Sequence, residues 1–158
     1  MTSASGPASD RAPGRALALD LGQRRIGVAY SDSARTLASP WGTVQRSGDP
    51  VRDRTAVLEA VTEVEATIVV VGLPLSLSGK SGPAAQAATV EIEALRALLE
   101  PMGVAVETTD ERFSTVEAQR GLTASGRKGP AARKVIDSAA AMVLLQAWLD
   151  GQRGRSGV

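Results

Sequence analysis

The sequence predicts a single α/β domain in which a mixed sheet of five strands carries packed helices. Apolar runs suited to strands alternate with stretches of helical spacing, in the order β-β-β-α-β-α-β-α-α. The 158 residues suit one domain of ordinary size and can bury most of its apolar surface. No internal repeat or second domain is visible, so one sheet accounts for the whole pattern.

The first half of the chain predicts three strands, a helix and a buried strand. Two apolar runs, 16–20 and 26–30, flank the basic turn Gln23-Arg24-Arg25 and read as an antiparallel pair. A third strand is expected at 41–46. Apolar spacing predicts a helix over 50–65, and the β-branched run 67–71 suits a central strand buried on both sides.

The second half predicts a long helix over 83–102, apolar at Val90, Ile92, Leu95, Leu98 and Leu99, which Gly103 ends. A strand follows at 104–108. Ser114 and Glu117 form a capping-box pattern that predicts a short helix, and 123–129 reads as a loop. The last helix is expected from about Pro130 to Gly151.

The two ends of the chain are expected to lie outside the folded domain. Residues 1–14 are rich in Ser, Ala, Gly and Pro and read as a disordered tail rather than a signal peptide. We therefore place the domain at 15–150 and a flexible tail at 151–158. No apolar run approaches the roughly twenty residues of a membrane span, so the cytoplasm is the expected location.

Composition narrows the chemistry that this chain can perform. It contains no cysteine and no histidine, which excludes thiolate nucleophiles, imidazole bases and the usual zinc ligands. Carboxylates, hydroxyls, lysines and backbone groups remain. Carboxylate oxygens suit Mg²⁺ or Mn²⁺. The net charge is +1, so any surface for nucleic acid has to be a local patch.

Asp20 is the first candidate for that chemistry. It ends an apolar strand and is followed by Gly22, at the edge where open α/β sheets place their ligands. Gly22 would let a phosphate or sugar approach the backbone closely. The alternative is an aspartate that simply makes a turn at the end of a strand.

Asp110-Glu111-Arg112 follows the expected strand 104–108 and is the second candidate. Adjacent residues of a strand point to opposite faces, so only one of the two acids is expected to join Asp20. The alternative is a polar strand exit in which Glu111 serves the N-terminus of the next helix.

Asp137 is the third candidate, because it interrupts a helix that is apolar almost all round. Counting three, four, seven and eleven residues on reaches Ala140, Ala141, Leu144 and Trp148, which form a packing face. An unpaired charge there is costly. Asp137 therefore needs either a metal ion or an arginine as its partner, and the sequence leaves both open.

A glycine-rich segment resembles a phosphate-binding P-loop but does not match it. Gly72 lies two residues too early for the sequence Gly79-Lys80-Ser81, and Pro74 occupies the required position. We exclude nucleotide binding of that type. The segment remains a candidate loop facing the substrate.

Basic residues on loops and helix starts could clamp the phosphate backbone of a nucleic acid. Ordinary solvated arginines are the alternative for at least half of them. The candidates are Arg24, Arg25, Arg112, Arg127, Lys128, Arg133 and Lys134.

Four segments together resemble the YqgF family, also called RuvX, of the RNase H-like nuclease superfamily. They occur in family order over residues 15 to 150. The first is Leu19-Asp20-Leu21-Gly22 with Arg25 to Ala29 and Ser31-Asp32, and the second is Val70 to Pro74 with Gly79 and Gly82. The third is Asp110-Glu111-Arg112 with Ser114-Thr115, and the fourth is Ile136 to Ala141 through Gln146 and Asp150.

The resemblance implies an RNase H-like mixed five-stranded sheet with helices on both faces and a site for Mg²⁺ or Mn²⁺. Its catalytic and metal-binding residues would be Asp20, Glu111 and Asp137. Related Holliday-junction resolvases carry a fourth acid one helical turn after the last, where this chain has Ala140 and Ala141.

The function implied is a metal-dependent endonuclease that processes the 5′ end of precursor 16S rRNA. A resolvase of branched DNA and a non-catalytic ribosome-assembly factor are the alternatives. An ATPase of the actin and Hsp70 type is disfavoured, because 158 residues cannot supply its two domains. The oligomeric state stays open, a homodimer included.

Overall fold

A computed structural model gives the fold and describes residues 13–73, 83–110 and 130–156. The short helix predicted from Ser114, the loop 123–129 and the Gly79-Lys80-Ser81 segment lie outside the described residues. The elements are β1 (Arg15–Leu21), β2 (Arg25–Ser31), β3 (Ala38–Gln45), α1 (Pro50–Val64), β4 (Ala66–Leu73), α2 (Pro83–Leu99), the 3₁₀ helix η2 (Glu100–Met102), β5 (Ala105–Asp110) and α4 (Pro130–Ser156).

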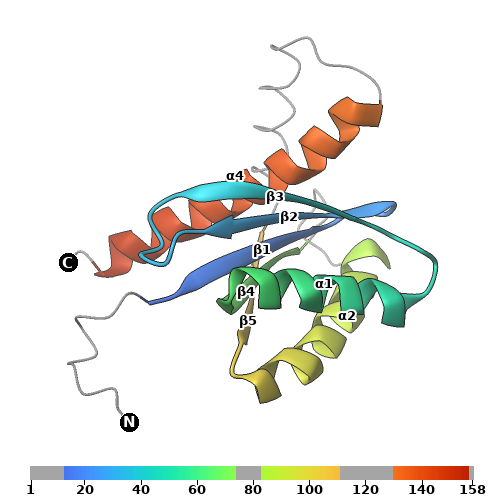
Figure 1. The fold of residues 1–158 in the computed structure, drawn as a ribbon, viewed down its shortest axis with the longest axis horizontal. Coiled ribbons are helices and arrows are strands. Elements are labelled where there is room, and N and C mark those ends of the chain that lie inside the picture. Colours follow the sequence, from blue (N-terminus) through green and yellow to red (C-terminus); the bar gives the residue numbers. More distant parts are fainter. Residues whose placement is uncertain (1–12, 74–82, 111–129, 157–158) are drawn as a thin grey trace.

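The five strands form one mixed sheet in the order β3-β2-β1-β4-β5, with β1 at its centre (Figure 1). β1 pairs antiparallel with β2, and β2 with β3, as expected for strands joined by short turns. β4 lies parallel to both β1 and β5. The carboxyl ends of β1, β4 and β5 therefore meet at one edge of the sheet.

Alternation along the strands sends two sets of apolar side chains to opposite faces, so the sheet is covered on both sides. The face that packs on α1 and α2 carries Leu17, Leu19, Ile26, Val28, Val69, Val71 and Val106. The opposite face carries Ala16, Ala18, Ala29, Ile68 and Val70 against Ala141, Leu144, Leu145 and Leu149 of α4. Three of the sheet residues under α4 are alanines, which allows the helix to approach the strands closely.

Three boundaries differ from those predicted. β3 starts at Ala38 rather than 41 and contains Pro40, which an edge strand tolerates, next to an irregularity in the pairing with β2. Pro101 lacks the amide that an α-helix needs, so α2 ends at Leu99 and residues 100–102 turn into η2. α4 continues to Ser156 instead of ending at Gly151, so most of the predicted tail is helical.

Three of the five apolar positions predicted to face the core from α2 are buried. Ile92, Leu95 and Leu99 are buried, whereas Val90 and Leu98 are exposed by 72% and 42%. Val90 lies near the middle of α2 and lines a cavity between this helix, the β1–β2 turn and α1. Within the described residues, no helix is long and apolar enough to cross a membrane.

Candidate active site

Asp20 lies next to last in β1, at the carboxyl edge of the sheet. It is partly buried and continues the alternation of Ala16 and Ala18, which pack against α4. Leu21, the next residue, packs on the opposite face with the α1 and α2 side chains. The position predicted for Asp20 is therefore confirmed, and α4 covers the face of the sheet on which it lies.

Two glycines flank Asp20 in the neighbouring strands. Gly27 of β2 and Gly72 of β4 are its partners in the strand registers. Neither contributes a side chain, so no neighbouring side chain in the sheet crowds the carboxylate at this level. Sequence reasoning did not identify either glycine as part of the site, although an antiparallel register drawn through the 22–24 turn would have placed Gly27 opposite Asp20.

Gly22 has a structural role in the turn that follows Asp20. A Cβ at this position would lie 2.6 Å from the carbonyl oxygen of Arg25, which no real side chain tolerates. The Gly22 amide donates to the Asp20 carbonyl oxygen at 2.9 Å. We expected Gly22 to admit a phosphate; the tight turn is sufficient reason for a glycine.

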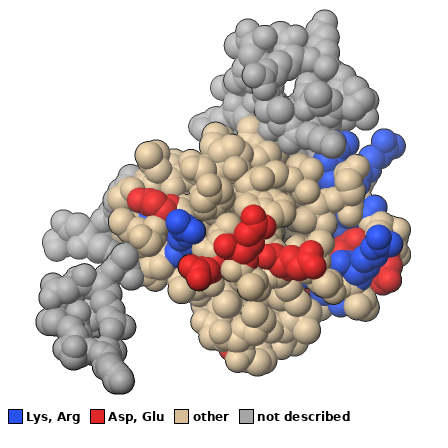
Figure 2. All heavy atoms as spheres, viewed as in Figure 1, with Lys and Arg blue, Asp and Glu red and all other residues tan. Residues whose placement is uncertain are grey.

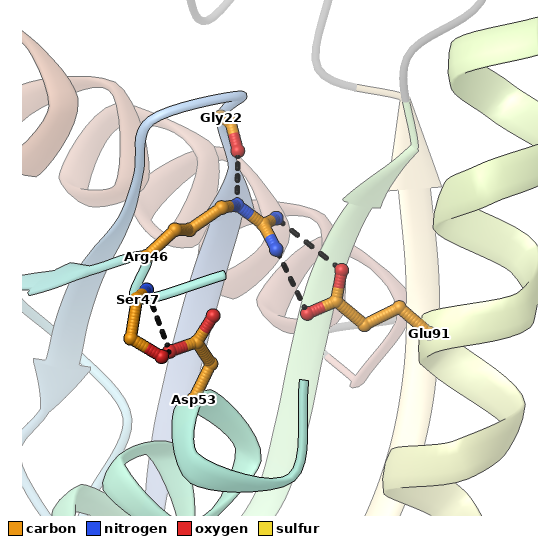
Figure 3. A network of polar contacts seen from close by, with 5 residues as sticks. All are labelled: Gly22, Arg46, Ser47, Asp53 and Glu91. Atoms are coloured by element: carbon orange, nitrogen blue, oxygen red, sulfur yellow. Dashed lines mark hydrogen bonds and ion pairs between the residues drawn. The ribbon is translucent and has the colours of Figure 1, made fainter. Parts of the chain in front are cut away.

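Arg46 holds this turn from the end of β3 (Figure 3). Its backbone amide donates to the Arg24 carbonyl oxygen at 2.9 Å and its Nε to the Gly22 carbonyl oxygen at 2.6 Å. The other two guanidinium nitrogens meet the Glu91 carboxylate of α2 at 3.2 and 3.4 Å. Arg46 thereby ties the turn after Asp20 to the helix on the opposite face. No sequence motif pointed to this arginine.

Asp53, in the first turn of α1, completes the polar network shown in Figure 3. The Ser47 hydroxyl donates to its Oδ1 at 2.7 Å and the Ser47 amide donates to the same oxygen at 3.0 Å. The Ser47 hydroxyl is the main reason that the pKa of the Asp53 carboxyl lies below its usual value. Asp53 is therefore an anion whose negative charge is already satisfied by its neighbours.

The other acids of the predicted site are described less completely. Glu111 lies outside the described residues. Asp110 ends β5 and pairs with Leu73, and Asp137 belongs to α4, but their side chains are not described. Among the residues that the structure describes, no group of three or more acids could hold a metal ion. The convergence of Asp20, Glu111 and Asp137 therefore stays a prediction.

The packing face counted from Asp137 is confirmed for its described members. Ala140, Ala141 and Leu144 are exposed by 2%, 0% and 1%, and Trp148 packs beside them. Because Ala140 and Ala141 are buried, an acid at either position would lie in a packed interface. This packing agrees with the absence of a fourth acid.

The predicted basic residues are only partly brought together. Arg24 lies in the turn after Asp20, and Arg25 opens β2 beside it. Arg133 and Lys134 belong to the first turns of α4, with side chains that are not described. Arg112, Arg127 and Lys128 lie outside the described residues.

The fold and the acidic residue at its carboxyl edge define an RNase H-like α/β domain. Two solved structures share this fold. Thermus thermophilus RuvC in complex with a Holliday junction substrate has a TM-score of 0.59 and 16% identity, and the match covers 89% of this chain and 96% of that one. A structure of RuvC from the same organism has a TM-score of 0.53 and 15% identity, and the match covers 90% of this chain and 96% of that one.

The chain belongs to the RuvX family, whose model, described as a Holliday junction resolvase, matches residues 14–151. A relative from Nocardia farcinica named "Putative pre-16S rRNA nuclease" is 46% identical over 91% of this chain and 82% of its own length. A relative of the same name from Rhodococcus opacus is 45% identical over 93% of this chain and 83% of its own length.

Proposed function

We propose that this chain is a metal-dependent endonuclease that hydrolyses phosphodiester bonds in structured nucleic acid and processes the 5′ end of precursor 16S rRNA. The observation that carries the proposal is the position of Asp20, at the carboxyl end of the central strand of a RuvC-like sheet. The names of relatives more than 40% identical over most of the chain support the rRNA substrate.

The environment of Asp20 fits a hard divalent cation. The carboxylate is partly buried and has a glycine on each side in the sheet. Oxygen ligands of this kind suit Mg²⁺ or Mn²⁺, which contribute Lewis acidity to phosphodiester hydrolysis. Asp20, Glu111 and Asp137 would hold the ion. Asp20 has the central role, since it comes from the middle strand.

The remaining residues have supporting roles in this proposal. Arg24 and Arg25, which follow Asp20 across one tight turn, would contact phosphates of the bound strand. Arg133 and Lys134 would do the same from the start of α4, which begins at the end of the molecule where β1 ends (Figure 1). With alanines at 140 and 141, the chain would rely on three acids.

A test of this proposal compares two isosteric substitutions. Asp20→Asn should abolish cleavage of a radiolabelled precursor 16S rRNA fragment in Mg²⁺ or Mn²⁺, because it removes a charged ligand. Its free energy of unfolding should change by less than about 1 kcal/mol, because the side chain is only partly buried. Asp49→Asn is the matched control, since asparagine caps a helix as well as aspartate does.

The outcomes separate the candidate functions. Normal turnover by the Asp20→Asn variant would rule out the proposed site. Cleavage of a four-way DNA junction but not of the rRNA fragment would favour the resolvase alternative, which the description of the family model supports. Unchanged rRNA maturation in cells that carry Asp137→Asn would favour a non-catalytic assembly factor.

A further inference from the structure

A cavity of about 570 Å³ lies on the face of the sheet opposite Asp20, beside the same turn. The β1–β2 turn forms one wall with Gln23 and Arg24, the start of α1 another with Arg54, and α2 a third with Ala87 and Val90. A smaller hollow shares Gln23 and Ala87 and reaches Leu21 and Gly22 at the end of β1. The smaller hollow therefore connects the cavity to Leu21 and Gly22, the residues that directly follow Asp20.

The walls of this cavity are held by the polar network of Figure 3. Arg46 and Glu91, which both line the cavity, are paired with each other at 3.2 Å. Asp53, also in the lining, accepts both hydrogen bonds of Ser47. Both carboxylates of the cavity are therefore already satisfied by neighbouring groups and do not need a cation from outside.

Two arginines of the lining are not neutralised in the same way. Neither Arg24 nor Arg54 pairs with an acid among the described residues, and the Arg54 Nε is buried with no hydrogen-bond partner there. The N-terminus of α1 lies beside this cavity at Pro50, and the Asp49 cap and Asp53 in its first turn offset its partial positive charge. The lining thus holds three guanidinium groups against two carboxylates, and two of the guanidinium groups are available to a ligand.

Basic side chains predominate on the surface around the cavity in the view of Figure 2. Figure 2 shows Lys and Arg side chains gathered on the right of the view, with some Asp and Glu side chains among them, where Figure 1 places the β1–β2 turn and the start of α1. The later turns of α1, in the middle of the view, are acidic. An anion would therefore be attracted to the end of the molecule that holds the cavity.

We propose that this cavity binds a nucleotide unit of the substrate strand that flanks the unit cut at Asp20, with Arg24 and Arg54 on its phosphate. Its volume is that of a small-ligand pocket, far larger than a free phosphate needs. Ala87, Val90 and Pro50 offer apolar contact to the sugar and base. None of the described lining residues is aromatic, so stacking on a base contributes little, and the phosphate contacts of the two arginines carry the binding.

The geometry of β1 connects this cavity to the active site. Asp20 and Leu21 are successive residues that point to opposite faces of the sheet, about 3.8 Å apart at their Cα atoms. A strand that crosses the sheet edge would therefore meet Asp20 on one side and the cavity on the other. This inference rests on the proposed function, because it assigns the cavity to the same substrate.

The test measures binding without cleavage. Fluorescence anisotropy of a labelled precursor 16S rRNA fragment in EDTA would compare the wild type with Arg24→Gln, Arg54→Gln and the double variant. The double variant should bind at least about tenfold more weakly, with a shallower salt dependence, because two phosphate contacts are lost. Arg52→Gln is the matched control: it is exposed in the same turn of α1, removes the same charge and does not line the cavity.

A second pair of variants tests the cavity from α2. Ala87→Glu places a negative charge in the lining, whereas Gln86→Glu places the same charge on the neighbouring exposed position outside it. Only Ala87→Glu should weaken binding, and its thermal melting should show a folded protein. Equal effects of Arg52→Gln and Arg54→Gln, or of the two glutamates, would overturn the cavity proposal.

The failure of each proposal gives a different result. If the wild type cleaves the rRNA fragment and the cavity variants bind it normally, the cavity proposal alone is wrong. If the wild type neither binds nor cleaves it, both proposals are wrong. The Asp20→Asn variant should still bind the rRNA fragment in EDTA but should not cleave it. A loss of binding in that variant would contradict the assignment of cleavage to Asp20 and of binding to the cavity.

Discussion

Single side chains hold several turns of this fold. Asp32, in the turn between β2 and β3, accepts hydrogen bonds from the hydroxyl and amide of Thr36 and from the amide of Leu37. Gln146 of α4 accepts from the Ala38 amide and donates to the Thr36 carbonyl oxygen, tying the helix to the same turn. Asp32 and Gln146 were among the residues that carried the family resemblance, and both act here as structural links.

The stability of the Asp32 turn should depend on acid pH. Its hydrogen bonds, led by the Thr36 hydroxyl and followed by the Leu37 and Thr36 amides, lower the pKa of Asp32 from 3.8 to about 2. Because the folded pKa lies below the unfolded one, the stabilisation is complete above about pH 4 and is lost as pH falls towards 2. The stability advantage over Asp32→Asn, measured by urea unfolding, should shrink across that range.

A second variant tests the cause of that pH dependence. Thr36→Val removes the hydroxyl donor, so the pH dependence assigned to Asp32 should weaken. An advantage over Asp32→Asn that stays constant from pH 5 to pH 2 would contradict the assignment.

The elements beside the site are joined by polar contacts between residues distant in sequence. Arg46 at the end of β3 joins the β1–β2 turn to Glu91 of α2, and both side chains are about one-fifth exposed. Asp49 caps α1 through the Val51 amide, and Glu65 ends the helix in the left-handed region at a φ of 57°. The cap and the β3–α1 loop together set the position of α1 against the cavity.

The Arg46–Glu91 pair should be worth more than an exposed ion pair. A double-mutant cycle with Arg46→Ala and Glu91→Ala should give a coupling of about 1–2 kcal/mol, because both groups are partly desolvated and the contact is bidentate. The Arg96–Glu93 pair is the control, because both residues lie on α2 and Glu93 is more exposed than Glu91. Its coupling free energy should be about 0.3–0.5 kcal/mol. Equal couplings in urea unfolding would contradict this ranking.

At the scale of the whole molecule, the sheet separates two apolar layers that share its strands. α1 and α2 bury one layer and α4 buries the other, and the central strands contribute to both. Neither layer can form without the sheet, so the domain should unfold as one cooperative unit.

Shortening a buried side chain of α4 should therefore destabilise the entire domain. Leu145 is fully buried, and Leu145→Ala should lower the free energy of unfolding by about 2–5 kcal/mol through lost burial and a cavity. Leu98→Ala, at a position 42% exposed, is the control and should cost less than about 1 kcal/mol. Urea unfolding followed by circular dichroism and by tryptophan fluorescence should give one coincident transition, and two separate transitions would contradict this view.

The sequence by itself determined the order of the elements and the position of Asp20. Local patterns were enough, because the alternation of Ala16 and Ala18 with leucines defines a strand and its two faces. The same reasoning identified Ala140, Ala141, Leu144 and Trp148 as the packing face of the last helix, whereas the placement of Asp137 on that face stays a prediction. The prediction was less successful at helix ends. The apolar pattern continued the α2 helix through Pro101 to residue 102, and it ended α4 at Gly151 instead of Ser156.

Only the tertiary structure decided which distant residues meet. Gly27 and Gly72 flank Asp20 because β1 pairs with β2 on one side and β4 on the other, and strand order is a non-local property. Arg46, Arg54 and Glu91 surround one cavity, although Arg46 and Glu91 are 45 positions apart in the chain. Such contacts depend on how layers pack against a shared sheet, and no local pattern of residues encodes that packing.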